Sequence, residues 1–190
     1  MDREHCLIAL RDFFAARDGT AMAAACAALG GEATPADPDT LEYAFNRLFV
    51  GPGKVVAPPY ASVYLDPEQR LMGDVTQRVA AIYEAIGLAC PLPGSLPDDH
   101  LALELDALLA FRALDTRAPG AELAALRHYF LHDHMALWLP RFAAAVRQAG
   151  EVPPAIARMV ALLLACLDEE LAETAPTAEQ AASDQGRNVA

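Results

Sequence analysis

The hydrophobic residues of this chain recur at helical spacing along most of its length. Leu7, Leu10 and Phe14, for example, lie three or four residues apart and fall on one face of a helix. Gly and Pro residues interrupt these amphipathic stretches, as they do at the ends of helices. The pattern predicts helices over about residues 3–17, 20–30, 40–49, 66–87, 98–114, 121–139, 141–150 and 153–173.

Polar residues and prolines set the expected ends of these helices. Thr20, Asp66 and either Asp98 or Asp99 are expected as N-caps, because their side-chain oxygens can accept hydrogen bonds from the first helical turn. Pro140 is expected to kink or end the helix in which it lies, since its ring removes a backbone donor.

The composition agrees with this helical pattern. Hydrophobic residues make up 54% of the 190-residue chain, and Ala and Leu supply most of them. Val and Ile nowhere form the alternating runs that are typical of strands. We therefore expect an all-α fold, a single compact multi-helix domain over residues 1–173. The polar residues 174–190 are expected to form a disordered C-terminal tail.

One segment, residues 50–66, combines prolines with apolar side chains. Pro58 and Pro59 deny the backbone donors that a helix needs, so the segment is predicted to be a loop. It also carries Tyr60 and Tyr64. A long loop this apolar either packs onto the body of a protein or binds a partner.

The chain is acidic, with 14 Lys+Arg against 26 Asp+Glu and a formal net charge of -12. Nucleic acid and an anionic membrane surface would be repelled, so neither is an expected partner. A basic peptide would be attracted. The plain alternative is that the acidity only keeps the protein soluble.

The cysteines and the apolar stretches indicate in which cellular compartment the protein is expected. The four cysteines are scattered and form no C-x-x-C pair, which favours buried thiols in a reducing compartment. Met1 is followed by polar residues, so we expect no signal peptide. The longest apolar stretch, 155–167, is interrupted by Arg158 and is too short to span a bilayer. We expect a cytoplasmic protein without stable membrane insertion.

A group of histidines offers one candidate site. His128 and His132 are four residues apart on a predicted helix, and His134 follows, so the rings could share a metal ion. The H-E-x-x-H pattern is absent, because Tyr129 and Phe130 follow His128. The alternative is that these histidines lie at a helix surface or at the edge of the core.

The sequence Asp98-Asp99-His100 could indicate acid–base chemistry. Adjacent residues on a helix point in different directions, however, so an N-cap and a polar first turn are the favoured interpretation. Gly51-Pro52-Gly53-Lys54 lacks the rest of a phosphate loop, and no serine has the G-x-S-x-G context. The residues therefore favour a binding protein over an enzyme.

Three blocks of sequence together resemble the TorD/DmsD type of redox-enzyme maturation chaperone. They are Tyr43–Pro52 with Pro58–Asp66, then Leu96–Leu105, then Phe130–Phe142. The resemblance covers roughly residues 40–145. It implies an all-helical cytoplasmic chaperone without a cofactor, not an enzyme. Such a chaperone binds the twin-arginine leader peptide of a molybdenum-cofactor oxidoreductase subunit and holds the precursor while the cofactor is inserted before export.

The resemblance also implies a peptide-binding site. It comprises Pro58, Pro59, Tyr60, Ser62, Tyr64, Pro97, Asp99 and His100. We expect the segment of residues 50–66, called the proline loop below, and the Pro97–His100 turn to lie side by side as one wall of a groove. Alternatively, Tyr60 and Tyr64 only fill the core, and packing is also the favoured role of Trp138. Some relatives carry Trp where this chain has Tyr60.

Two other functions stay open at this stage. One is a metal-dependent enzyme that uses His128, His132 and His134, and the other is a helical scaffold that binds a folded partner subunit. The residues name neither the client enzyme nor the working form, which could be a monomer or a domain-swapped dimer.

Overall fold

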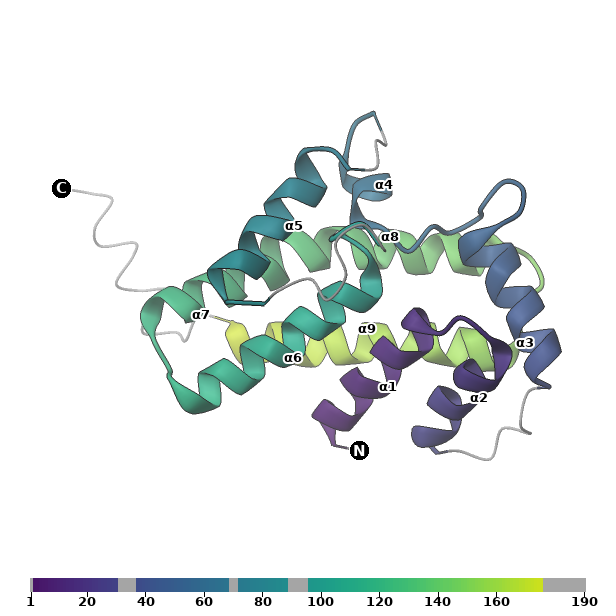
Figure 1. The fold of residues 1–190 in the computed structure, drawn as a ribbon, viewed down its shortest axis with the longest axis horizontal. Coiled ribbons are helices and arrows are strands. Elements are labelled where there is room, and N and C mark those ends of the chain that lie inside the picture. Colours follow the sequence, from purple (N-terminus) through teal and green to yellow (C-terminus); the bar gives the residue numbers. More distant parts are fainter. Residues whose placement is uncertain (1, 31–36, 69–71, 89–95, 176–190) are drawn as a thin grey trace.

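The computed structural model describes residues 2–30, 37–68, 72–88 and 96–175 (Figure 1). In chain order the elements are α1 (Arg3–Ala15), α2 (Gly19–Ala28), α3 (Pro38–Phe45), η1 (Asn46–Val50), α4 (Ala61–Leu65), α5 (Asp74–Ala85), α6 (Leu101–Arg117), α7 (Ala121–His128), η2 (Tyr129–Met135), α8 (Ala136–Gln148) and α9 (Pro154–Thr174). The π-helical turns η1 and η2 continue α3 and α7. Within the described ranges no strand occurs, which confirms the predicted all-α class.

The last helix, α9, contacts elements from both halves of the chain: α1, α3, α7, η2 and α8. The first helix, α1, packs against α2 and α6 as well as α9. Above α8, α4 and α5 form a raised unit, in which α4 contacts both of its neighbours (Figure 1). The fold is therefore closed by contacts between its first and last helices.

Phenylalanine rings from α1, α3, η1 and α8 fill the centre of the core. Phe13 contacts Phe45 with ring centroids 5.5 Å apart, and Phe14 contacts Phe49 at 5.8 Å. Phe142 of α8 lies 5.7 Å from Phe49. The first two contacts are edge-to-face, the geometry that brings a positive ring edge to a negative ring face. All five rings are buried, so they join the N-terminal helices to α8.

The start of α2 differs from the predicted one. Asp18, not Thr20, is the N-cap, and its carboxylate accepts a hydrogen bond from the Ala21 backbone N–H at 2.8 Å. Gly19 follows the cap, and a Cβ atom there would lie 1.9 Å from the Pro38 carbonyl oxygen. Only glycine therefore allows α2 to approach the start of α3 this closely.

The region after Pro59 also departs from the prediction. The expected loop over residues 50–66 contains the short helix α4, because no proline lies between Tyr60 and Asp66 to prevent one. The next helix was expected to begin at Asp66, but α5 begins after its N-cap Gly73. The Asp66 carboxylate instead accepts a hydrogen bond from the Glu68 backbone N–H in a local turn.

Pro140 does not end its helix, contrary to one of the two expected outcomes. It lies inside α8, which continues to Gln148. Its neighbours Trp138, Leu139 and Phe142 are fully buried. Burial of these large side chains offsets the helical hydrogen bond that the proline ring removes.

The C-terminal helix α9 extends to Thr174. Apart from residues 174 and 175, the predicted tail lies outside the described residues, so its disorder stays a prediction. Among the helices that the structure describes, none is long and apolar enough to cross a membrane.

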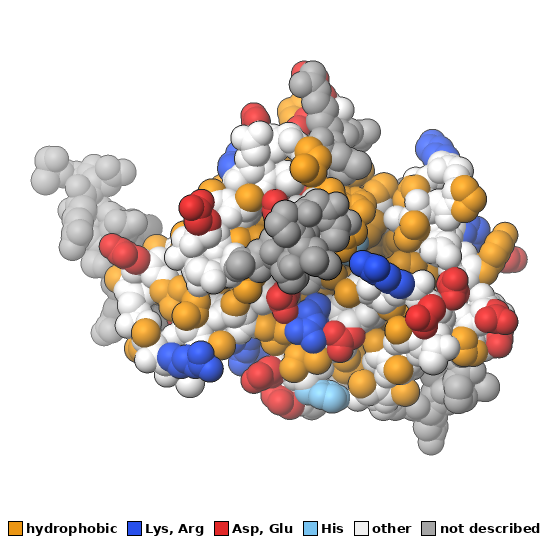
Figure 2. Space-filling view, in the orientation of Figure 1, with side chains coloured by type: hydrophobic (Ala, Val, Ile, Leu, Met, Phe, Trp, Pro, Cys, Tyr) orange, Lys and Arg blue, Asp and Glu red, His pale blue; other side chains and the backbone are white. Residues whose placement is uncertain are grey.

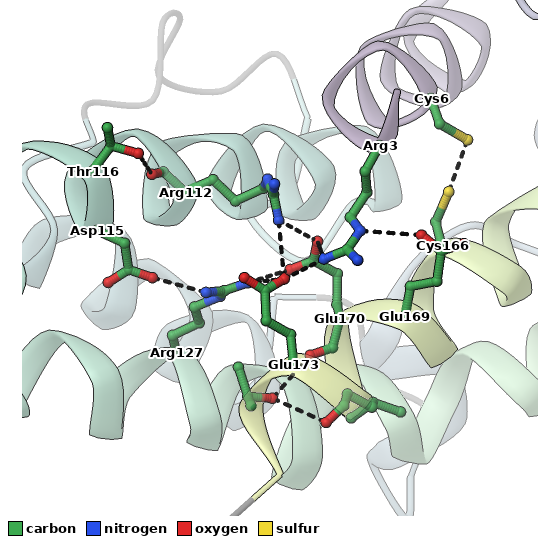
Figure 3. Close-up of polar contacts among 12 residues, drawn as sticks. Arg3, Cys6, Arg112, Asp115, Thr116, Arg127, Cys166, Glu169, Glu170 and Glu173 are labelled. Carbon is green, nitrogen blue, oxygen red and sulfur yellow. Dashed lines mark hydrogen bonds and ion pairs between the residues drawn. The ribbon is translucent and has the colours of Figure 1, made fainter. Parts of the chain in front are cut away.

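A buried carboxylate, Glu170, ties the end of α9 to α6 and α7 (Figure 3). Its Oε1 accepts a hydrogen bond from Arg112 at 2.9 Å, and its Oε2 accepts one from Arg127 at 2.6 Å. Arg3 of α1 lies 3.6 Å away. A charge in this position is stable only because guanidinium groups replace the lost hydration. Glu170 therefore acts as a polar hub for four helices.

Replacing this hub should destabilise the fold. We expect Glu170→Ala to lower the free energy of unfolding by about 3 kcal/mol, because Arg127 would be left buried without this partner. The neighbouring Glu169→Ala should cost less than about 1 kcal/mol, since Glu169 is exposed. Urea denaturation of both variants measures the difference, and equal effects would contradict the assignment of Glu170 as the hub.

Candidate functional site

The proline loop and the Pro97–His100 turn lie side by side. Tyr60 and His100 form an isolated antiparallel bridge. The Ala61 N–H donates to the Asp99 carbonyl oxygen at 3.0 Å, and the Leu101 N–H donates to the Pro59 carbonyl oxygen at 2.9 Å. The Tyr60 and His100 rings meet edge-to-face with centroids 5.0 Å apart. Two segments 40 positions apart in the sequence are therefore joined at their backbones.

Asp99 is fully buried beneath this junction. Its carboxylate accepts hydrogen bonds from the Ser62 backbone N–H and from the Thr76 hydroxyl, both at 2.8 Å. The expectation that Asp98 or Asp99 caps α6 is wrong, because His100 is the N-cap residue. A buried carboxylate that accepts two hydrogen bonds holds the donating segments in place, so we assign Asp99 a positioning role.

His100 is also almost fully buried, and it caps α6 through its ring. Nδ1 accepts a hydrogen bond from the Ala102 backbone N–H at 3.1 Å. Burial lowers the pKa of His100 to about 4, although the nearby Asp99 charge opposes this effect. The ring is therefore neutral at pH 7, and its proton resides on Nε2 because Nδ1 is an acceptor.

The tyrosines of the proline loop are partly buried. The Tyr64 ring stacks on Trp138 with centroids 5.8 Å apart, and Arg141 donates to the Tyr64 carbonyl oxygen at 2.7 Å. Burial raises the pKa of Tyr60, and the Asp99 charge adds to that effect. Trp138 is fully buried, so it packs in the core as expected. Tyr60 and Tyr64 thus combine an anchored side with a side that reaches the surface.

Two hydroxyl groups at the site have no partner among the described residues. They are Ser62 Oγ, which is fully buried, and the Tyr64 hydroxyl. Buried polar atoms are nearly always hydrogen-bonded in folded proteins. Both groups therefore have unused hydrogen-bonding capacity within α4.

A third buried carboxylate, Glu104, lies one helical turn after His100. It accepts hydrogen bonds from His134 Nε2 at 2.6 Å and from Trp138 Nε1 at 3.0 Å. Burial raises the pKa of Glu104, and the bonds from His134 and Trp138 oppose this. Sequence reasoning gave this triad no role. The i, i+4 spacing of His134 and Trp138 is the signal that could have indicated a shared partner.

Thr76 and Tyr83 of α5 were also missed. The Thr76 hydroxyl donates to Asp99, and the Tyr83 hydroxyl donates to the Asp98 carbonyl oxygen at 2.8 Å. No motif marks either residue, because their partners lie in another segment of the chain. Helix α5 thus holds the Pro97–His100 turn through these two hydrogen bonds.

The surface beside these residues is partly apolar and partly acidic. Pro58, Tyr60, Tyr64 and Pro97 are each partly exposed, whereas Pro59 is buried. Figure 2 shows hydrophobic side chains gathered between the raised α4–α5 unit and α3. Directly after Tyr64 in sequence, a cavity of about 290 Å³ is lined by Leu65, Asp66, Pro67, Glu68, Gly73, Asp74, Val75 and Arg78. The apolar side chains beside an acidic cavity suit an apolar peptide with cationic residues. A continuous groove stays a prediction.

The three histidines do not converge on one point. His128 and His132 stack with ring centroids 4.1 Å apart and face Thr174 at the end of α9. His134 instead contacts buried Glu104. In the part of the chain that the structure describes, no group of three metal-binding side chains is arranged to hold a metal ion.

The buried bonds of Asp99 lead to a stability prediction. Asp99→Ala should lower the free energy of unfolding by about 3 kcal/mol, because the Ser62 N–H and the Thr76 hydroxyl lose their acceptor. Asp98 is partly exposed, so Asp98→Ala should change the free energy of unfolding by less than about 0.5 kcal/mol. Chemical denaturation compares the two, and a neutral Asp99→Ala would rule out the positioning role.

The buried ring of His100 predicts a pH dependence. Its pKa is 6.5 in the unfolded chain and about 4 in the fold, so its stabilising contribution is complete above pH 6.5 and is lost as the pH falls towards 4. Between about pH 7 and pH 4, the protein should lose about 3 kcal/mol more stability than His100→Asn, which keeps a capping oxygen. Stability is measured by thermal or urea unfolding at each pH for both proteins. If stability falls equally with pH in the original protein and in His100→Asn, His100 is not held as a neutral ring.

Comparison with protein families places this fold among known proteins. The family model described as "Nitrate reductase delta subunit" matches residues 15–144. That range contains the proline loop, the Pro97–His100 turn and the Glu104 triad. It covers more than half of the chain.

Curated relatives agree with the family match. The chain is 34% identical over 143 residues to the "Chaperone protein TorD" of Psychrobacter sp., covering 72% of this chain and 63% of that protein. It is 33% identical over 104 residues to the "Tat proofreading chaperone DmsD" of Salmonella typhi, covering 55% and 48%. The matches thus span between about half and two thirds of these relatives. Both relatives are named as chaperones, not as enzymes.

A solved structure shares the fold. It is described as a redox enzyme maturation protein from Archaeoglobus fulgidus, with a TM-score of 0.59, 24% sequence identity, and coverage of 87% of this chain and 94% of that one. At this identity the likeness concerns the fold alone. On the family match and the curated relatives, the chain belongs to the nitrate reductase delta subunit family, which is the family of the TorD/DmsD-type redox-enzyme maturation chaperones.

Proposed function

We propose that this protein is a cytoplasmic chaperone that binds the twin-arginine leader peptide of a molybdoenzyme precursor and holds it for cofactor insertion before export. The observation that carries the proposal is the junction of Tyr60 and His100, which brings the proline loop against the start of α6. The relatives named as chaperones support the general role.

The chemistry of such a leader suits this surface. Its apolar stretch would lie against Tyr60, Tyr64 and the exposed prolines, where the aromatic rings supply contact area at a low cost in side-chain entropy. Its two arginines would find carboxylates on a chain with a net charge of -12. His100 is neutral at pH 7, so it adds no charge that would repel them.

The architecture also suits binding more than chemistry. Asp99 and Glu104 are fully buried and bonded within the fold, and His100 uses Nδ1 to cap α6. These groups form a rigid base under Tyr60, which keeps the binding surface in one shape before the peptide arrives. Preorganisation of this kind lowers the entropic cost of binding.

Titration calorimetry with synthetic leaders tests the proposal. We expect a leader from a molybdoenzyme of the same organism to bind with a dissociation constant of about 1 µM or lower, without turnover. A leader with both arginines changed to lysine should bind more weakly, because lysine cannot make bidentate contacts with a carboxylate. Added salt should also weaken binding.

A matched pair of variants locates the site. Tyr60→Ala should weaken leader binding about tenfold while the helical circular dichroism signal is unchanged. Tyr43→Ala removes a tyrosine that is 73% exposed on α3 and should leave the affinity unchanged. Equal losses of leader affinity in the two variants would show that the binding site lies elsewhere. Binding of a mature subunit but of no leader would favour the scaffold instead.

A further inference from the structure

Two cysteines from opposite ends of the chain meet next to the Glu170 hub (Figure 3). Cys6 of α1 and Cys166 of α9 lie with their Sγ atoms 2.7 Å apart. Both thiols are buried, with 2% and 6% of each residue exposed. A disulfide bond needs a separation of about 2.0 Å, so the two sulfur atoms are already most of the way to bonding distance.

The surrounding contacts hold the two helices in register at this point. Arg3 lies three residues before Cys6, and Glu169 lies three residues after Cys166. The Arg3 guanidinium donates to the Glu169 carboxylate at 3.1 Å. Residues three apart share a helix face, so this ion pair lies one turn away from the thiols on both helices. The approach of the sulfur atoms is therefore built into the packing of α1 on α9.

We propose that Cys6 and Cys166 are a modification site: they form an intramolecular disulfide bond between α1 and α9 when the folded protein meets a peroxide. The two thiols supply two electrons and two protons, and hydrogen peroxide is reduced to two molecules of water. This inference is independent of the leader-binding function.

The reaction balances in two steps. The thiolate of one cysteine attacks a peroxide oxygen, the O–O bond breaks, and the departing hydroxide takes a proton to leave as water. The second sulfur then attacks the resulting sulfenic acid, the S–S bond forms, the S–O bond breaks, and the second hydroxide takes the remaining thiol proton. Burial raises the pKa of Cys166, helped by its bond to Cys6 and by the Glu169 and Glu170 charges, so the first step should be slow at neutral pH and faster in alkali.

The bond would connect two residues that are 160 positions apart. A cross-link that closes so long a loop removes much of the freedom of the unfolded chain. Cys26, which is partly buried on α2, lies outside this pair and is therefore replaced in the protein used for the test.

The test uses the full chain with Cys26→Ser and Cys90→Ser, so that only the pair remains. After treatment of the folded protein with hydrogen peroxide, mass spectrometry should show the loss of two hydrogen masses and a linked peptide containing Cys6 and Cys166. The thermal midpoint should rise by roughly 10 °C and return on reduction. The linked peptide should form faster at about pH 9 than at about pH 7.

The control protein carries Cys6→Ser in addition to Cys26→Ser and Cys90→Ser. It should show neither the linked peptide nor the higher thermal midpoint. Oxidation of the pair to sulfinic acid without a linked peptide, or a link formed only between two molecules, would overturn the proposal. A folded protein that keeps both thiols free after peroxide treatment would overturn it as well.

Discussion

The buried carboxylate of Asp99 fixes a relation among three segments that local structure alone would not bring together. It accepts one hydrogen bond from the start of α4 and another from Thr76 of α5, while its own backbone belongs to the turn before α6. Burying a carboxylate costs free energy unless such donors replace water. The same arrangement places Tyr60 against His100. The shape of the candidate site therefore depends on a residue that does not face solvent.

The acidic residues fall into two groups with different roles. Asp99, Glu104 and Glu170 are fully buried, and each joins elements that are far apart in the chain. Removing a donor from any of them would leave a buried carboxylate with fewer hydrogen bonds in a medium of low polarity. Other acids, such as the partly exposed Asp66 and the exposed Asp74, lie near α4 and α5, where they contribute to a field that attracts cations.

Sequence reasoning succeeded where a signal repeats over several turns. The amphipathic periods of α1, α6 and α9 were sufficient to identify these helices, and the prolines correctly marked the irregular chain before Tyr60. It failed where the signal is short. Helix α4 has five residues, too few to show a period, and the N-cap of α6 is a histidine next to two better-known capping residues. The resemblance names Asp99 among the peptide-binding residues but does not convey exposure, and Asp99 is fully buried.

By itself the sequence determined the helical class, the acidic balance and the three blocks that carry the family resemblance. These follow from composition, from periodicity and from runs of adjacent residues, all of which are local properties of a chain. Only the tertiary structure decided that Tyr60 faces His100, that Asp99 is an internal support, and that His134 belongs with Glu104 and not with His128. Each of these depends on residues at least 23 positions apart. Such pairings are set by the packing of the whole core, which no single stretch of the sequence encodes.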